Sequence, residues 1–485
     1  MNGKHPTGSR SEVSRRTFLK SAAAAGAGLA LVAPRIVSAE NLGTETVNVG
    51  IIGAGNEARV LVITNSIKIP GVRFRAIADI WPWNRGRMAR LLKKFKHETN
   101  EYTDYQEMLA KEKDLDAVII ASPDCVHAEH SIASLKAGLH VYCEKEMSNT
   151  IEKARQMVLT AKQTGKLLQI GHQRRSNPRY HMALDYINRV KAIGRMTNVM
   201  GNWNRAKPLH IDKWSDKAVL PKAVLEKYGY GTMERFRNWR WYKQFSGGPI
   251  ADLGSHQIDI FCWFLNAMPK SVIASGGTDN YPKMEWYDNV LAVYEWDYKF
   301  GGETRSVRGH YQLFSTTSHG GYQETFMGNE GSLVISEGAG IGGLRREYSA
   351  EMADWEYELQ KAVAARATSA ADLKKEVMAL RTEVEGLRKA AGQTVEQEKG
   401  EKEEEIKIGH SVPAPGRYYP PIPAPLPAKP EHMPHLENFF DAVRGKAKLN
   451  CPGEIGYETA VAVLRVNDAI ATGKKIEFKP EDFHA

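Results

Sequence analysis

The 485-residue sequence has few cysteines and, beyond its N-terminal segment, no long apolar run. Its four cysteines show no C-x-x-C spacing, which argues against a zinc site, and we expect no bound metal. No later segment has the length and apolarity of a membrane helix, so we expect no membrane association after the leader is removed. Apolar residues at 42% and charged residues at 25% are typical of a globular protein, and the length predicts two or three domains.

Residues 1–39 have the pattern of an export leader. Ser14–Lys20 matches the twin-arginine motif, Ser21–Ala33 is a short apolar run, and Val37–Ala39 is a small-residue cleavage site. The alternative is a fortuitous basic amphipathic helix. We predict a twin-arginine signal peptide and a periplasmic protein. The leader carries six Lys or Arg and one acid, so about half of the net charge of +9 leaves with it, and we expect no nucleic-acid partner.

A glycine-rich turn follows the first apolar stretch of the globular part. The β-branched run Val47–Ile52 predicts a buried strand, and the next six residues, GAGNEA, fit the G-x-G-x-x-G/A pattern. Gly53 permits a tight turn, Gly55 lets a pyrophosphate approach the backbone, and Ala58 lets the following helix pack closely. Glycines at this spacing also mark ordinary turns, but the strand and helix on either side favour a dinucleotide site.

An acidic residue ends the second apolar stretch, Val72–Ala78. Asp79 lies near the spacing at which a carboxylate binds the adenosine ribose hydroxyls. A carboxylate there also repels the 2′-phosphate of NADP, so we predict NAD in preference to NADP, although Arg85 and Arg87 lie close enough in sequence to soften that preference. The predicted cofactor site therefore begins with Gly53, Gly55, Asn56, Ala58 and Asp79.

Residues 46–170 alternate strand-like and helix-like stretches, such as the helix Ile151–Thr164 stopped by Gly165. Repeated units of this size predict an α/β domain with a doubly wound parallel sheet, the Rossmann arrangement. Such sheets bind ligands at the carboxyl ends of their strands. The polar or glycine residues at those predicted ends are Gly53, Asp79, Ser122 and the pair Glu144-Lys145.

Residues 171–335 differ from the first domain. Their strand-like segments surround one clear helix, Pro249–Leu265, and predict an α+β domain with a largely antiparallel sheet. The tail, 435–485, resumes globular character with two helical stretches. We expect this tail to pack on the second domain.

An insertion, 336–434, separates the second domain from the tail, and we assign it no function. Its segment 351–391 has apolar residues at a 4,3 spacing, which favours an amphipathic helix on the protein body over an intermolecular coiled coil. A charge run, 398–407, is expected to be solvated. The segment 413–434 contains nine prolines and predicts an extended tether without a folded element.

Two polar stretches point to chemistry beyond the glycine turn. Glu144 and Lys145 end a predicted strand at the cofactor cleft, where desolvation can lower the pKa of a lysine towards a useful range; an exposed salt bridge is the alternative. Asp252, His256 and Asp259 lie at i, i+4 and i+7 of the predicted helix, on one polar strip. A carboxylate one turn from a histidine can orient the ring for proton transfer, whereas the alternative is a hydrogen-bonded structural cluster.

In these motifs the chain resembles the glucose–fructose oxidoreductase / inositol dehydrogenase (Gfo/Idh/MocA) family, over 46–335 and 435–485. The family's Glu-Lys-Pro motif corresponds to Glu144-Lys145-Glu146. Its Gly-Gly-Gly-x-x-x-Asp-x-Gly-x-His-x-x-Asp motif corresponds to Gly247–Asp259. Glu146 replaces the family proline, which adds a carboxylate beside the lysine, could raise its pKa and puts its ordinary role in doubt. Pro249 replaces the third glycine, a mild change at a helix start.

The resemblance implies roles for particular residues. It implies Lys145, Asp252 and His256 around the reacting carbon, with His256 as the proton acceptor. It also implies Ser122, Pro123 and His127 near the nicotinamide ribose, and a segment, Gly171–Arg175, that leads from the cofactor to the substrate. The cofactor site thus gains Ser122, Pro123, His127, Glu144, Lys145 and Gln173, and the substrate site holds Arg174, Arg175, Asp252 and His256.

Three functions fit these residues. The first is hydride transfer between a tightly bound nicotinamide cofactor and a sugar, cyclitol or related polyol. The second is an NAD-dependent glycosidase-like or epimerase-like reaction without net redox change, and the third is a binding protein without activity. Turnover to a carbonyl product would support the first function, and release of an aglycone or epimer without net redox change would support the second. Bound cofactor without any turnover would support the third. We also expect a homo-oligomer, a dimer or tetramer, formed through the C-terminal sheet.

Overall fold

The computed structural model describes residues 45–206, 214–338, 341–357, 416–419 and 428–485. One compact unit, Val47–Ala485, carries the fold. Three predicted features lie outside the described residues: the leader at 1–39, the amphipathic helix of 351–391 beyond Tyr357, and the charge run at 398–407.

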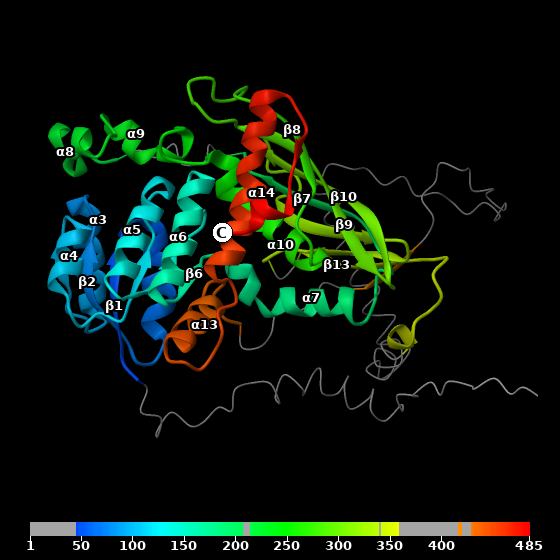
Figure 1. Ribbon diagram of the computed structural model, residues 1–485, viewed down its shortest axis with the longest axis horizontal. Coiled ribbons are helices and arrows are strands. Elements are labelled where there is room, and N and C mark those ends of the chain that lie inside the picture. Colours follow the sequence, from blue (N-terminus) through cyan, green and yellow to red (C-terminus); the bar gives the residue numbers. More distant parts are fainter. Residues whose placement is uncertain (1–44, 207–213, 339–340, 358–415, 420–427) are drawn as a thin grey trace, which may run out of the picture. The chain divides into compact units, whose positions relative to one another are not determined.

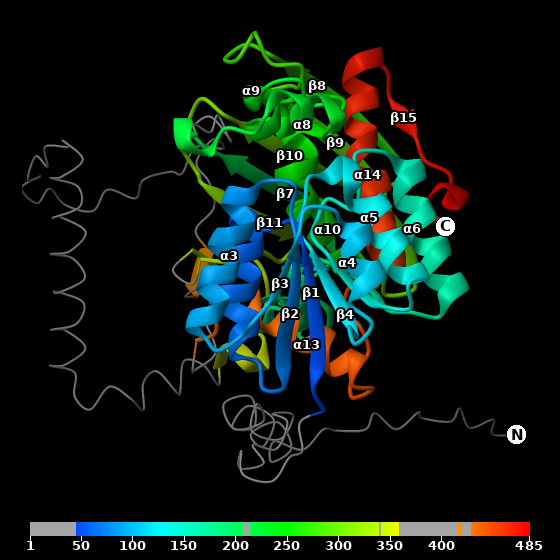
Figure 2. The ribbon, with the colours of Figure 1, turned by 90° about the vertical axis from the view of Figure 1, so that its left-hand side faces the viewer.

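Six parallel strands form the first sheet among the described residues, in the order β3-β2-β1-β4-β5-β6. This order is that of a doubly wound fold and confirms the predicted Rossmann arrangement. Figure 2 shows α3 on one side of the sheet and α5 and α6 on the other. The strands are β1 (Val47–Ile52), β2 (Val72–Ala78), β3 (Asn100–Tyr102), β4 (Ala117–Ile120), β5 (His140–Cys143) and β6 (Leu168–Ile170). The helices are α2 (Asn56–Arg59), continuing as the π-helix η2 (Val60–Asn65) and the 3-10 turn η3 (Ser66–Lys68), then α3 (Pro82–Lys94), α4 (Tyr105–Lys111), α5 (Asp124–Lys136) and α6 (Ile151–Thr164).

Nine strands form the second sheet within the described ranges, in the order β14-β13-β12-β11-β7-β10-β9-β8-β15. The neighbours are antiparallel except β7 and β10, so the sheet is largely antiparallel as predicted. Figure 1 shows this sheet on the far side of α10 and α14 from the first sheet. Its strands are β7 (Met196–Asn204), β8 (Ser271–Gly277), β9 (Asn289–Phe300), β10 (Glu303–Phe314), β11 (Tyr322–Gly328), β12 (Gly331–Ile335), β13 (Gly342–Glu347), β14 (Gly416–Tyr419) and β15 (Ile476–Glu477).

The predicted helix at Pro249–Leu265 differs from the observed one in its first turn. Ile250–Gly254 form a π-helix, η7, and the α-helix α10 begins only at Ser255 and ends at Leu265. A π turn bonds i to i+5, so it changes the angle between residues before and after it. The other elements here are η4 (Gln173–Ser176), α7 (Pro178–Asn188), η5 (Asp216–Ala218), α8 (Lys222–Lys227), α9 (Met233–Arg237), η6 (Trp239–Trp241), α14 (Gly453–Thr472) and η8 (Pro480–Phe483).

The tail divides between the two sheets. Helix α13 (Met433–Val443) buries Leu436 and Phe439 in the core beneath β1 and β2, and the Phe439 ring lies 5.7 Å from that of Tyr142 in β5. His435 Nε2 lies 2.9 Å from the last carbonyl of β6. The expectation that the whole tail packs on the second domain is therefore wrong for α13. Helix α14 does contact β8 and α10, and it also contacts α6 of the first domain.

The predicted insertion contributes to the second sheet. Its strand β13 pairs with β12, and β14 pairs with β13, both antiparallel. The Arg417 guanidinium of β14 binds the buried Glu356 carboxylate, with Nε 2.9 Å from Oε1, and fixes this edge. The prediction of an extended tether over 413–434 is thus wrong at β14, and again at Met433, where α13 begins.

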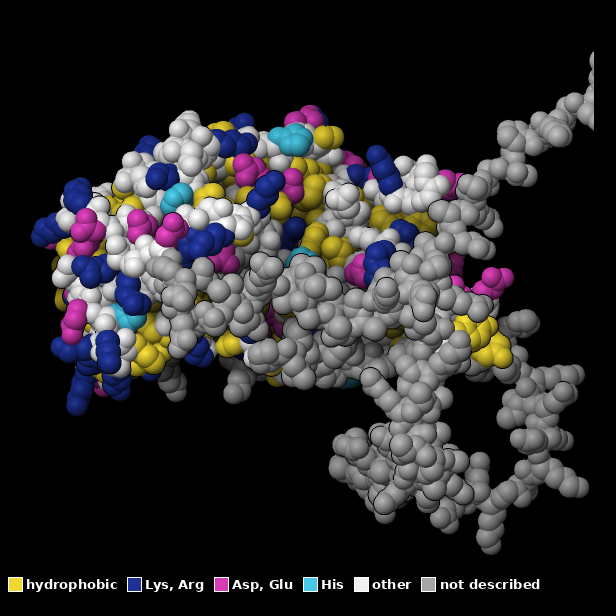
Figure 3. Space-filling model, turned by 90° about the horizontal axis from the view of Figure 1, so that it is seen from below, with side chains coloured by type: hydrophobic (Ala, Val, Ile, Leu, Met, Phe, Trp, Pro, Cys, Tyr) yellow, Lys and Arg dark blue, Asp and Glu magenta, His cyan; other side chains and the backbone are white. Residues whose placement is uncertain are grey.

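The outer face of the second sheet carries an apolar row. Ile273 pairs with Val293 across β8 and β9, and His310 of β10 links Val293 to Met200 of β7. Ile273 and Val293 are 48% and 43% exposed, which is unusual for cross-strand apolar neighbours. Elsewhere, Figure 3 shows Lys and Arg side chains mixed with acidic ones over the end of the molecule formed by the first domain. In the part of the chain that is described, no helix is both long and apolar enough to cross a bilayer.

Candidate active site

A cavity of about 760 Å³ opens at the carboxyl ends of the first sheet, with η7 and the second sheet on its other side. It gathers most of the residues predicted from sequence, although they come from distant parts of the chain. Those that line it are Gly53, Gly55, Asn56, Asp79, Ser122, Pro123, His127, Glu144, Lys145, Gln173, Asp252 and His256. Ala58, Arg174 and Arg175 do not line it.

The glycine turn leaves space for a phosphate group. Gly53 has φ +84°, and a Cβ there would lie 2.6 Å from the backbone nitrogen of Ser122, so β1 and β4 approach closely only because this residue is glycine. A Cβ on Gly55 would meet nothing within 4 Å, so this stretch of backbone borders open cavity at the start of α2. Ala58 is buried beneath the turn. A dinucleotide pyrophosphate fits this combination of open backbone and helix N-terminus.

Asp79 is held in place by the turn that it faces. Its Oδ2 accepts from the Ala54 N–H at 2.7 Å and its Oδ1 accepts from the Trp81 N–H at 2.7 Å. Each oxygen keeps a second lone pair that can accept from a ribose hydroxyl. Arg85, which could attract a 2′-phosphate, donates instead to the Asp79 carbonyl at 2.7 Å and pairs with Glu101 at 3.4 Å.

The Lys145 ammonium binds Asp252 across the cavity. Its Nζ donates to the Asp252 carbonyl at 2.8 Å and to Oδ1 at 3.1 Å. Burial lowers the pKa of Lys145, but the charges of Asp252 and Glu144 outweigh burial and raise it. The predicted lowering of this pKa is therefore wrong, because the sequence did not reveal the Asp252 contact, and Lys145 is a cation. Arg240 Nε lies 3.3 Å from the same Oδ1.

His256 is a neutral ring at the cavity wall. Burial, with the positive charges of Lys145 and Arg174, holds the pKa of His256 well below its usual value. Its Nδ1 is buried with no hydrogen-bond partner among the described residues. Asp252 binds Lys145 and Arg240 instead of the imidazole among the described residues, which corrects the predicted acid–histidine pair. An unprotonated imidazole is the form that accepts a proton.

Arg174 and Arg175 are buried in ion pairs outside the cavity, contrary to the prediction that they bind substrate. Arg174 binds Glu324, and its Nη2 lies 3.1 Å from Glu337 Oε2. Arg175 Nε donates to both oxygens of Asp259, at 2.8 and 3.0 Å, so the third member of the predicted polar strip also leaves the cavity. Their charges are neutralised locally, and both arginines hold the wall of the site.

Glu146 lies beneath the site. The Lys145–Glu146 peptide bond is cis, and the Glu146 carboxyl is fully buried, with Oε1 accepting from the Met147 N–H at 2.6 Å. Its Oε2 has no hydrogen-bond partner among the described residues, and burial raises the pKa of Glu146 to about 8. The charges that raise the pKa of Lys145 are those of Asp252, Glu144 and Glu57. The raised pKa of Lys145 that was predicted from Glu146 thus comes from other carboxylates.

Several cavity residues had no clear signal in the sequence. Trp203 lies next to the last residue of β7 and stacks on Tyr322 of β11 with ring centroids 4.7 Å apart, and its ring lies 5.5 Å from the His256 ring. Asp124 begins α5, accepts from Ser246 Oγ at 2.9 Å, and has a pKa raised to about 7 by burial. The insertion reaches the cavity through Glu337, Glu431 and His432, which only the fold brings there.

Comparison with known proteins agrees with this architecture. Residues 47–172 match the oxidoreductase family with an NAD-binding Rossmann fold, and residues 189–334 match the GFO/IDH/MocA C-terminal domain. The chain belongs to the GFO/IDH/MocA family. Residues 12–32 match the twin-arginine translocation signal, so this family member carries an export signal.

Curated relatives in the family include dehydrogenases and reductases. The chain is 31% identical over 235 residues to the uncharacterized oxidoreductase YrbE of Bacillus subtilis, covering 48% of this chain and 58% of the relative. It is 31% identical over 228 residues to inositol 2-dehydrogenase of Salmonella typhimurium, covering 47% of this chain and 55% of the relative. It is 28% identical over 186 residues to 1,5-anhydro-D-fructose reductase of Ensifer adhaerens, covering 38% of this chain and 48% of the relative. The chain thus spans about half the length of these relatives.

Solved structures share the fold at low identity. An NAD-binding protein from Listeria innocua aligns with TM-score 0.61 and 19% identity over 90% of this chain and 100% of its own. A levoglucosan dehydrogenase in complex with NADH aligns with TM-score 0.59 and 18% identity over the same shares. Both alignments extend over the two sheets of the GFO/IDH/MocA architecture.

The Glu146→Gln variant tests the buried carboxyl. Between the ordinary pKa of about 4.5 and the raised value of about 8, the native state binds more protons at this site than the unfolded state does. The free energy of unfolding therefore falls as pH rises through this range. We expect Glu146→Gln to stabilise the protein in urea denaturation at about pH 8.5, and to do so less at about pH 5. Glu152→Gln, on an exposed carboxyl, is the control, and an equal effect at both pH values would contradict the assignment.

Proposed function

We propose that the protein is an exported oxidoreductase that transfers a hydride between a retained NAD and a hydroxyl of a sugar, cyclitol or related polyol. The observation that carries the proposal is the convergence of Lys145, Asp252 and His256 at one end of the cavity whose other end is the glycine turn. Relatives named inositol 2-dehydrogenase and 1,5-anhydro-D-fructose reductase support this substrate class. The export signal supports a periplasmic location.

The dinucleotide would be held by residues at the strand ends. The Gly53–Asn56 turn would receive the pyrophosphate, and the Asp79 carboxylate would accept from the adenosine ribose hydroxyls, which favours NAD over NADP. Ser122, Pro123 and His127 would line the nicotinamide ribose side, with Glu144, Lys145 and Gln173. When bound, the nicotinamide supplies the hydride acceptor or donor.

His256 and Lys145 divide the work on the substrate hydroxyl. The neutral His256 ring accepts the hydroxyl proton as the carbonyl forms, and its low pKa keeps it available below neutral pH. The Lys145 cation, fixed by Asp252, donates to the same oxygen and stabilises the negative charge that develops on it. Asp252 therefore positions Lys145.

Trp203 supports a carbohydrate as the substrate. Its ring, stacked on Tyr322, lies beside His256 at the cavity wall. Aromatic faces pack against the apolar C–H surfaces of a sugar ring, while its hydroxyls reach the charged groups around it. The Arg174 guanidinium lies 5.8 Å from the Trp203 ring and 6.0 Å from the Tyr322 ring, and so braces the stacked pair.

A homo-oligomer would bury the apolar row on the second sheet. Ile273 and Val293 are exposed on the neighbouring strands β8 and β9, and Met200 is partly exposed on β7, beyond His310 of β10; apolar rows of this kind are typical of interfaces. A two-fold contact would cover the row on both copies at once.

The His256→Ala variant tests the proton acceptor. Removing the imidazole should lower turnover on the sugar by about 10²–10⁴-fold, because proton transfer is lost. Bound NAD should stay near the wild-type level, since His256 lies on the second domain. Activity is followed by carbonyl product formation across a panel of sugars and cyclitols, with the exposed His484→Ala as the control. A variant that unfolds and loses NAD while a residual rate survives would assign His256 a structural role.

Cofactor retention is the second test. The periplasm is not expected to hold free NAD, so only a retained cofactor supports many turnovers, and the insertion residues Glu337, Glu431 and His432 add a wall to the cleft. The mature protein, purified without nucleotide and then denatured, should release close to one equivalent of NAD. An empty protein whose rate depends linearly on added NAD would contradict retention.

The Val293→Asp variant tests the oligomer. A charge in the middle of the apolar row should dissociate the assembly, which light scattering after size exclusion detects as a fall in mass. Thr304→Asp, an exposed residue of β10, is the matched control and should keep the wild-type mass. A wild-type protein that is monomeric, or a Val293→Asp variant of unchanged mass, would contradict this interface.

A further inference from the structure

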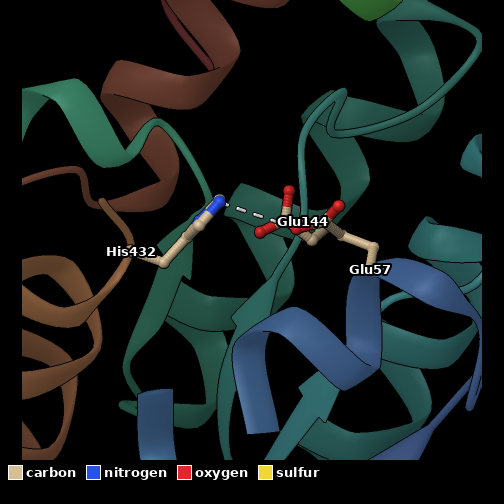
Figure 4. A group of neighbouring side chains, drawn as sticks. All are labelled: Glu57, Glu144 and His432. Carbon is tan, nitrogen blue, oxygen red and sulfur yellow. Dashed lines mark ion pairs between the residues drawn. The ribbon is translucent and has the colours of Figure 1, made fainter. Parts of the chain in front are cut away.

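Three potential metal ligands converge on the cofactor side of the cavity. Glu57 lies in the first turn of α2, Glu144 follows β5, and His432 precedes α13. Their ligand atoms all lie within 4.8 Å of one another. Figure 4 shows the imidazole of His432 turned towards the two carboxylates, each side chain coming from a different element. None of the three donates or accepts a proton in the transfer at Lys145 and His256, although the charge of Glu144 raises the pKa of Lys145.

The contacts of this group are incomplete. The His432 Nε2 to Glu57 Oε1 distance is 3.8 Å, too long for a hydrogen bond. Glu57 Oε1 and His432 Nδ1 are buried atoms with no hydrogen-bond partner among the described residues. Glu144 is only 4% exposed and receives long hydrogen bonds of 3.2 Å from the Tyr142 hydroxyl and the Lys145 N–H. Two carboxylates thus face each other with one weakly placed imidazole beside them.

The backbone makes room for these carboxylates. A Cβ on Gly171 would lie 2.6 Å from Glu144 Oε1, so the glycine after β6 permits the carboxylate to turn towards Glu57. All three side chains also line the cavity, which leaves positions for water or another oxygen ligand. Three protein ligands with an open position are the pattern of an exchangeable metal site.

We propose that Glu57, Glu144 and His432 bind a first-row divalent cation, with Zn²⁺ and Mn²⁺ as the matching ions. Two carboxylate oxygens and one imidazole nitrogen suit these ions, whose bonds of about 2.0–2.2 Å require the ligand atoms to close in by less than about 1 Å. The cation neutralises two facing carboxylates. It also ties the segment before α13 to the glycine turn, which would stabilise the closed wall of the cavity.

Titration of the untagged mature protein with Mn²⁺ tests the site. After chelator treatment and dialysis, calorimetry with MnCl₂ and the electron paramagnetic resonance signal of free Mn²⁺ should report one tight site. Loss of an outer-sphere partner alone costs about 10–100-fold in metal affinity, so Glu57→Gln and His432→Ala should each lose at least about tenfold. Zn²⁺ should compete with Mn²⁺ for the same site.

Glu431→Gln is the matched control, because Glu431 lines the same cavity next to His432 but lies outside the ligand group. It should bind Mn²⁺ like the wild type. Thermal denaturation without metal identifies a variant that fails to fold, and His432→Asp, which keeps an oxygen ligand, should then restore binding. Absence of saturable binding to the wild type would overturn the proposal, as would equal binding by wild type, Glu57→Gln and His432→Ala. Neither result depends on turnover of any sugar.

Discussion

The ion pair between Lys145 and Asp252 is the contact on which the arrangement of the cavity depends. Lys145 follows the last residues of β5 in the first sheet, whereas Asp252 lies in η7 against the second. Their side chains are only 14% and 9% exposed, and a buried charge without its partner is strongly unfavourable. The pair therefore sets the distance between a strand end and a π turn, and α10 then carries His256 into the same cavity.

Buried charge pairs behind the cavity wall support this contact. Arg174 bridges Glu324 of β11 and Glu337, which follows β12, and it lies against the stacked rings of Trp203 and Tyr322. Such pairs add little net stability, but removing one partner is costly, so they restrict the wall to one arrangement. The groups that face the cavity can then keep distinct charge states, a cationic Lys145 beside a neutral His256.

Local sequence patterns predicted the elements of the first sheet well. They predicted the second sheet and the site less well. The helix Ile151–Thr164 agrees with the prediction at both ends, because Thr150 caps it and Gly165 ends it within the same short stretch. No capping residue of this kind marks the π turn that contains Asp252. Its hydrogen-bond pattern depends on how the turn packs against the rest of the protein, which the local sequence does not show. The family resemblance implied Arg174 at the substrate, and no local pattern could reveal its partner Glu324, which is 150 residues away. His432 lay in a proline-rich stretch, and only tertiary structure brings it to Glu57.

A double-mutant cycle on Lys145 and Asp252 tests this account most directly. Lys145→Met and Asp252→Asn, alone and together, are compared by the free energy of unfolding in urea. We predict a coupling energy of about 1–3 kcal/mol, with the double variant more stable than the sum of the two single losses implies. Additive losses, with a coupling energy near zero, would contradict the claim that this pair holds the two sides of the cavity together.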